Sequence, residues 1–179
     1  MTFNVSSFKS SVRGFLRPHS FEVFILPPGS SNIGSLNALN SIRLRTEGIA
    51  LPGAAFLTAD NYRQYSNGLT YTIPYGSNPQ EIIATHTVDD QGVIIQILYD
   101  WVNEVVDLKG DFKYAPAYYE EYTRDMVINI YEQSGTKIKT YRLTGVYPIS
   151  YDQIQMAWES TDQITKIPVT YRYEYFTIE

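Results

Sequence analysis

Hydrophobic and polar residues alternate along the last part of the chain, from Ile167 to Tyr175. The odd positions carry isoleucine, valine and tyrosine, whereas the even positions include threonine, arginine and glutamate. A two-residue period is typical of a β-strand that buries one face in a core. The pattern predicts a strand, a turn and a long closing strand over residues 151–179, with Trp158 buried and the turn at residues 160–162.

Apolar and β-branched runs bounded by turn residues predict further strands upstream. Pro27 and Gly29 follow the first of these runs, and Leu51-Pro52-Gly53 follows the second. Proline and glycine set turn conformations and end a ladder of backbone hydrogen bonds. The predicted strands are residues 21–26, 42–49, 82–88, 126–133 and 138–146.

A protruding β-hairpin is predicted over about residues 62–75. Asn67 and Gly68 lie there between two alternating aromatic flanks, and Asn-Gly is a strong signal for a two-residue hairpin turn. Pro74 has no backbone N–H, so the second strand of this hairpin should lie at an edge or an end of a sheet. Ser134-Gly135 predicts a second hairpin between the strands on either side of it.

One helix is predicted, over about residues 90–109. Asp89 and Asp90 can cap its first turn, and Lys109 followed by Gly110 is typical of a helix end. At about 100° per residue, its apolar and polar side chains lie on opposite faces. The apolar face comprises Ile94, Ile97, Leu98, Trp101, Val105 and Leu108, and the polar face comprises Gln96, Asp100, Asn103 and Asp107.

Residues 114–122 are rich in tyrosine and contain Pro116. The proline argues against a helix, and the tyrosine content argues against a simple linker. We therefore expect this segment to be irregular and to cover part of the domain.

These elements predict a mainly β domain of the α+β class, built as a β-sandwich or flattened barrel with one flanking α-helix. The sequence has no repeat at a solenoid period and no regular alternation of strands and helices. A chain of 179 residues is most simply one domain, which we assign to residues 21–179. The polar, serine-rich residues 1–20 are predicted to form an N-terminal arm.

The charge and composition exclude several classes of protein. A net charge of −5 argues against a dedicated nucleic-acid binder, whose affinity would come from lysine and arginine. The chain contains no cysteine, so it has no disulfide or cysteine-based zinc site and suits a reducing cytosol. Neither a cleaved signal nor a membrane span is expected, because no apolar run approaches about 20 residues.

Candidate chemistry is sparse. The two histidines are His19, in the arm, and His86, which precedes Asp89 and Asp90. A His-Asp pair or an oxygen-rich metal site can be imagined around His86, but no nucleophile motif or metal-binding motif accompanies it. A structural or solvent-facing role for His86 is favoured. We predict no enzyme activity, no catalytic or metal-binding residue, and no cofactor.

The remaining signals concern association. The 16 tyrosines are concentrated in the predicted hairpin, in residues 114–122 and near the C-terminus. Exposed aromatic patches and sheet edges either aggregate or meet a specified partner. Some of these tyrosines would complete the core, but self-assembly explains the set better.

Several motifs occur in one order along the chain, and together they resemble the tail-tube protein family of contractile-tailed bacteriophages. The most specific is Trp158-Glu-Ser-Thr-Asp162 followed by Val169-Thr-Tyr-Arg-Tyr173. The resemblance extends from about residue 13 to the C-terminus. The other motifs are residues 14–23, Leu51-Pro-Gly53, Thr72-Ile-Pro-Tyr75, Tyr99-Asp-Trp101 and residues 139–148.

The resemblance implies a structural virion protein. Its subunits would form hexameric rings with a shared inner β-barrel, and the rings would stack into a tail tube that conducts DNA into the host cell. The implied partners are other copies of the chain, the sheath, baseplate and tail-terminator proteins, and DNA in transient, non-specific passage. Assembly in the host cytoplasm and final location in the virion tail follow from the same resemblance.

The resemblance and the polar faces of the predicted elements also suggest roles for individual residues. Candidates for contacts between subunits are Phe8, Phe15, Arg17, Tyr62, Tyr65, Tyr71, Tyr75, Arg172 and Glu174. Candidates for the lumen, where a polar or acidic lining would keep DNA adhesion low, are Asn129, Glu132, Gln133, Gln153 and Gln155. Candidates for a sheath-facing surface are Asp100, Asn103 and Asp107.

Two alternatives remain open at this point. A baseplate protein that initiates the tube, or the tube protein of a phage-derived injection particle, would share the fold. A β-sandwich that binds a carbohydrate or a partner protein would instead use the tyrosines as stacking platforms. Rings or tubes of the purified protein would distinguish the first class from the second.

Overall fold

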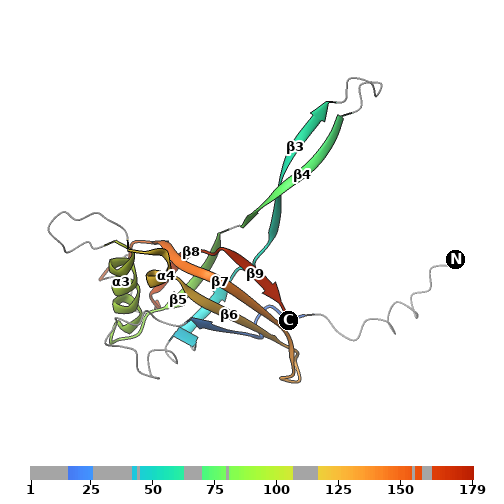
Figure 1. Ribbon diagram of the computed structural model, residues 1–179. Helices are drawn as coiled ribbons and strands as arrows, with labels where there is room; N and C mark the ends of the chain where they lie inside the picture. The colour runs from blue at the N-terminus through green and yellow to red at the C-terminus, as the bar shows by residue number, and fades with distance from the viewer. Residues whose placement is uncertain are drawn as a thin grey trace.

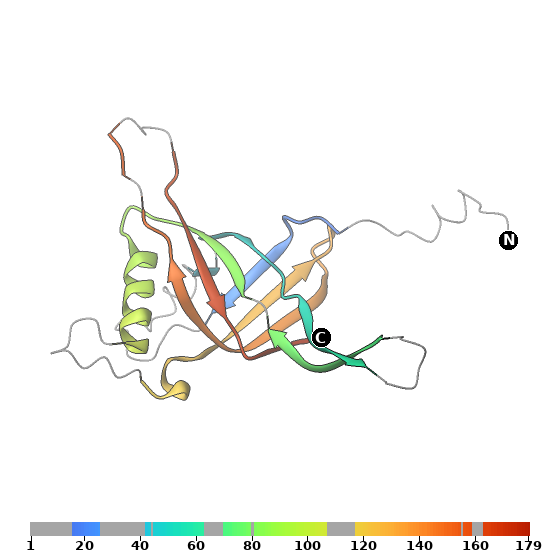
Figure 2. The same cartoon turned by 90° about the horizontal axis from the view of Figure 1, so that it is seen from above.

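The computed structural model describes residues 16–25, 42–43, 45–62, 70–79, 81–106, 117–154, 156–158 and 163–179. Within these residues, antiparallel strands form one seven-stranded sheet that curves around its core (Figures 1 and 2). Its order is β1 (Phe21–Ile25), β6 (Arg124–Tyr131), β7 (Lys137–Tyr151), β8 (Lys166–Arg172), β5 (Ile82–Thr87) and β2 (Thr46–Ile49), with β9 (Tyr175–Ile178) also paired to β7. The predicted mainly β class is confirmed.

Strand β7 belongs to both halves of the curved sheet. Its first part pairs with β6 and β9, and its last part pairs with β8. The change of partner occurs around Gly145, which has a φ of 68°, a conformation that favours glycine. A Cβ atom at this position would lie 2.5 Å from the Tyr119 hydroxyl oxygen. Glycine therefore allows both the bend of β7 and the close approach of the segment packed over it.

The core lies between the curved sheet and helix α3 (Val93–Val105). Four residues of the predicted apolar helix face are buried, whereas Val105 is half-buried. Trp101 is 1% exposed, packs against Tyr171, and donates a hydrogen bond from Nε1 to the carbonyl oxygen of Tyr122 at 2.7 Å. The buried helix residues are Ile94, Ile97, Leu98 and Trp101.

Helix α3 begins at Val93, later than the predicted start at about residue 90, and it also ends early. The Asp89 carboxylate accepts a hydrogen bond from the backbone N–H of Val93 at 3.0 Å and pairs with Arg45. The predicted end at Lys109 is wrong, because Val106 is already extended. Ala117 donates a backbone hydrogen bond to the Val105 carbonyl at 3.1 Å, so a tertiary contact occupies the last turn.

The predicted hairpin exists and is longer than residues 62–75. Strands β3 (Ala54–Tyr62) and β4 (Thr70–Pro79) pair with each other and, within the described residues, with no other strand. They project away from the sheet (Figure 1). Pro74 lies within β4, near a bulge between Leu57 and Thr58, which is tolerated because each strand of the pair has a free edge.

Several local predictions are wrong, each for an identifiable reason. The strand predicted at residues 42–49 starts only at Thr46, because its hydroxyl donates to the Ile42 carbonyl and closes a helical turn. The segment predicted to be irregular contains a short helix, α4 (Tyr119–Tyr122). The Glu121 side chain accepts a hydrogen bond from the Tyr118 backbone N–H and so caps the start of this helix.

The closing segment also differs from the expected single strand. It divides into β8 and β9, and Glu174 between them donates its backbone N–H to the Thr144 carbonyl. Alternate positions are buried through Tyr173 as predicted, but Tyr175 is exposed. Trp158, predicted to be buried, is fully exposed because β7 ends at Tyr151 and the chain leaves the core.

Candidate assembly interface

The β3–β4 hairpin carries the first of two unusual apolar surfaces. Its described side chains include four large apolar groups that are 42–69% exposed, and we call these the hairpin surface. A lone two-stranded hairpin is marginally stable in water, and a soluble monomer seldom exposes a large contiguous apolar patch. We therefore expect another surface to pack against the hairpin. The four side chains are Phe56, Leu57, Ile73 and Tyr75; Phe56 and Leu57 are consecutive in β3, so apolar groups are exposed on both faces of the hairpin;.

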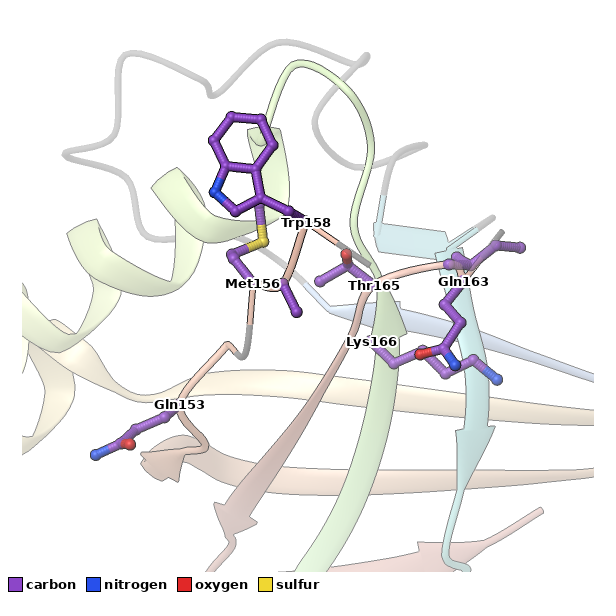
Figure 3. A pocket seen from close by; sticks show the side chains of 8 residues that line it. Gln153, Met156, Trp158, Gln163, Thr165 and Lys166 are labelled. Atoms are coloured by element: carbon purple, nitrogen blue, oxygen red, sulfur yellow. The ribbon is translucent and has the colours of Figure 1, made fainter. Parts of the chain in front are cut away.

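The second apolar surface lies between β7 and β8. Met156, Trp158 and Ile164 are 83%, 102% and 69% exposed, and they border a groove of about 620 Å³ that we call the loop groove. Figure 3 shows Trp158 and Met156 on one side of this groove and Gln163 and Lys166 on the other. Among the described lining residues, the groove combines an apolar wall with one cationic side chain.

The proposed contact residues differ in how fully the structure places them. Arg17, Tyr75, Arg172 and Glu174 are all exposed, and Glu174 packs beside Gly145 of its own chain. Tyr62 and Tyr71 lie in the paired hairpin strands, but their side chains lie outside the described part. Phe8, Phe15 and Tyr65 lie outside the described residues.

The lumen candidates do not gather on one surface. Glu132 and Gln133 are exposed in the turn before β7, whereas Gln153 is exposed just after β7. Asn129, on β6, is half-buried and accepts a hydrogen bond from the Thr140 hydroxyl at 3.0 Å. Gln155 lies outside the described residues.

Two of the three sheath candidates, Asp100 and Asn103, lie on α3 outside its buried face. Asp100 is half-buried and accepts a hydrogen bond from the Gln96 side chain at 2.8 Å. Asn103 is half-buried, and its side-chain amide atoms are buried without a hydrogen-bond partner among the described residues. Asp107 lies outside the described residues.

His86 is a buried structural residue. The Thr46 hydroxyl donates its hydrogen to the Ile42 carbonyl, so the Thr46 oxygen is left to accept from His86 Nδ1, at 3.2 Å. The other ring nitrogen, Nε2, therefore carries no hydrogen and accepts from the Tyr171 hydroxyl at 3.1 Å. Burial lowers the pKa of His86 from 6.5 to about 4 and raises the pKa of Tyr171, because burial disfavours the charged forms. The chain of hydrogen bonds joins β2, β5 and β8 around a neutral imidazole.

We expect stability to fall as His86 becomes protonated. Because the pKa of His86 is lower in the folded state, the unfolded chain binds more protons than the folded chain between about pH 6.5 and 4;. The stability that comes from the neutral imidazole is fully present above about pH 6.5 and is lost as the pH falls through this range. The free energy of unfolding should fall by about 2–3 kcal/mol between pH 7 and 4.5. Urea unfolding of the wild type and of His86→Gln measures the difference. Parallel pH profiles would contradict the prediction.

Neither a metal centre nor a membrane helix is evident where side chains are described. These residues contain no group of three or more histidine, cysteine, aspartate or glutamate side chains placed to hold a metal ion. No helix among them has the length and apolar character needed to cross a bilayer. The ion pair between Arg124 and Glu104, at 3.2 Å, instead joins β6 to α3.

Comparison with known proteins identifies the family. The model of the phage tail tube protein family matches residues 16–179, which is most of the chain. The chain therefore belongs to the phage tail tube protein family. A comparison with curated protein sequences found no match.

Solved structures share the fold at low sequence identity. A chain of the 6-fold symmetrised anti-feeding prophage baseplate aligns with a TM-score of 0.67 and 12% identity, covering 94% of this chain and 97% of that chain. A chain of the PVC extracellular contractile injection system, from the sheath-tube complex in the extended state, aligns with a TM-score of 0.64 and 13% identity, covering 99% of this chain and 99% of that chain. A chain of the anti-feeding prophage tube-terminating cap aligns with a TM-score of 0.64 and 16% identity, covering 94% of this chain and 93% of that chain.

Proposed function

We propose that this protein is the structural subunit of a contractile phage tail tube. Its copies form hexameric rings with a shared inner β-barrel, the rings stack, and the resulting tube conducts DNA into the host cell. The β3–β4 hairpin carries this proposal: it exposes four large apolar side chains and pairs with no other described strand. Assembly between copies would cover these groups and stabilise the hairpin.

The free edges of the sheet support the same proposal. β1 and β2 stand at the two ends of the strand order among the described residues. Free sheet edges favour pairing with another chain, and closure into a barrel removes them. Contacts through the hairpin and through exposed Arg17, Arg172 and Glu174 would join neighbouring subunits, with the other contact candidates contributing from the arm and the hairpin.

The proposed mechanism is conduction without catalysis. A net charge of −5 suits a channel that repels DNA phosphates, because a lysine- and arginine-rich lining would hold them. Glu132 and Gln133 at one end of β7, and Gln153 beyond the other, are the exposed candidates for such a lining. Asp100 on α3 is the described candidate for contact with the sheath, because the side-chain amide atoms of Asn103 are buried.

Purified protein provides the direct test. Size-exclusion chromatography and negative-stain electron microscopy over a concentration series should reveal rings and long tubes. A strictly monomeric species at high concentration would refute the proposal. Single rings that never elongate would favour a baseplate initiator of the same fold.

A second class of function has one specific observation in its favour. The fully exposed Trp158 ring borders a groove, and aromatic rings of this kind can stack on a sugar. A monomeric protein that binds a glycan, with binding lost in Trp158→Ser, would identify a carbohydrate-binding β-sandwich.

A further inference from the structure

We infer that the hairpin surface of one subunit docks into the loop groove of a neighbouring copy. This inference rests on the proposed self-assembly and specifies the two surfaces that meet. Each surface exposes large apolar side chains in the subunit. A single contact between two different surfaces would cover both.

The two surfaces lie at opposite ends of β8. Lys166, the first residue of β8, lines the loop groove. Tyr173, just after the last residue, donates a hydrogen bond from its hydroxyl to the carbonyl of Gly53 at the base of the hairpin. From that base the hairpin projects away from α3 and the loop (Figures 1 and 2). The hairpin of a subunit therefore cannot fill that subunit's own groove.

A contact between two different surfaces has a definite consequence for assembly. Each subunit offers a hairpin to one neighbour and a groove to another, so the contact is head-to-tail. Repetition of such a contact gives a closed ring or an open stack, whereas a contact between identical surfaces stops at a dimer. The placement of the two surfaces thus fits an extended assembly.

The chemistry of the two surfaces is complementary. A groove of about 620 Å³ falls within the range that buries a drug-sized molecule, so it has room for more than one side chain. Its walls include Met156 and Trp158, which match the apolar groups of the hairpin surface.

Charge favours the same occupant. Asp60 is the single charged residue among the described hairpin side chains, and Lys166 is the single charged residue among the described residues that line the groove. Lys166 is 48% exposed while it pairs with Glu47 of its own chain at 2.6 Å, so its ammonium group can meet a second carboxylate. A hairpin from another copy supplies both the apolar groups and the opposite charge.

Cysteine cross-linking tests this contact without background, because the chain has no cysteine. Ser77 pairs with Phe56 across the hairpin, and Ala157 lines the groove. A disulfide requires the two Cα atoms to lie within about 7 Å. In assembled protein, the double variant Ser77→Cys/Ala157→Cys should form an oxidised ladder longer than a dimer.

The matched control is Ser77→Cys/Thr136→Cys, which moves the second thiol to the exposed turn between β6 and β7. It should remain monomeric on a denaturing gel. Tubes that yield no ladder from the groove pair, a product that stops at dimer, or an equal ladder from the control would each overturn the inference. The proposed function would survive these results, since it fails only if the purified protein forms no stacked tubes.

A substitution in the groove gives an independent readout. Trp158→Ser should leave the subunit as stable as the wild type, because exposed side chains contribute little to stability, while raising the concentration needed for tube formation at least about tenfold. Tyr118→Ser, at an aromatic residue that is 82% exposed elsewhere, should leave that concentration unchanged. Normal polymerisation of Trp158→Ser, or equal loss in both variants, would contradict the inference.

Discussion

A subunit that lacks the hairpin should fold normally and form no tubes. Ala55 and Asn78 face each other across the hairpin, so Asn-Gly can replace residues 56–77 and close the strands with a two-residue turn. The sheet and α3 keep their contacts, and the free energy of unfolding should stay within about 1 kcal/mol of the wild type. Circular dichroism, urea unfolding and negative-stain microscopy measure the two effects separately.

The matched control is Thr58→Ser, which keeps the hairpin and its four apolar side chains. It should form tubes at the wild-type concentration. Loss of folding in the shortened subunit would place the hairpin in the subunit's own core. Tubes from the shortened subunit would remove the hairpin from assembly altogether.

Trp101→Ala should cause the largest loss of stability. The side chain is 1% exposed, its ring lies 6.0 Å from that of Tyr171, and its N–H bonds the carbonyl of Tyr122. Removing a buried tryptophan costs about 3–5 kcal/mol, and the Tyr122 carbonyl also loses its partner. This loss is a large part of the roughly 5–15 kcal/mol that holds a domain folded. Urea unfolding measures it.

The conservative variant Trp101→Phe separates packing from hydrogen bonding. It keeps most of the ring in the core and removes the N–H donor, so it should cost about 1–3 kcal/mol. A loss below about 1 kcal/mol for Trp101→Ala would show that the site collapses around the cavity or that α3 is not part of the cooperative core.

Periodicity predicted the elements with one buried face. β8 lies where alternation placed it, β1, β5 and β6 lie close to the strands predicted from apolar runs, and the buried face of α3 follows the helical period. These patterns are reliable because burial itself imposes them. Ends of elements were less predictable, since Val105 and Thr46 use contacts that no local pattern records.

The candidate interface was only partly predictable. Asn67-Gly68 predicted a hairpin, and the described strands do pair, from Tyr62 with Thr70 onward; the Asn-Gly turn itself lies outside the described residues. An element exposed on both faces has no buried stripe to mark its length. Phe56 and Leu57 were therefore missed, although their exposure is central to the hairpin surface. Trp158 was assigned to the core because large aromatic residues are usually well buried; its exposure follows from where β7 ends.

The antiparallel order of the sheet also affects how the subunit reaches its folded state. Phe21 of β1 pairs with Ile130 of β6, and Tyr141 of β7 pairs with Ile178 of β9. Pairings between such distant parts of the chain slow folding to about milliseconds or seconds, and unpaired strand edges promote aggregation meanwhile. β1 must therefore wait during synthesis until β6 has left the ribosome before it can pair.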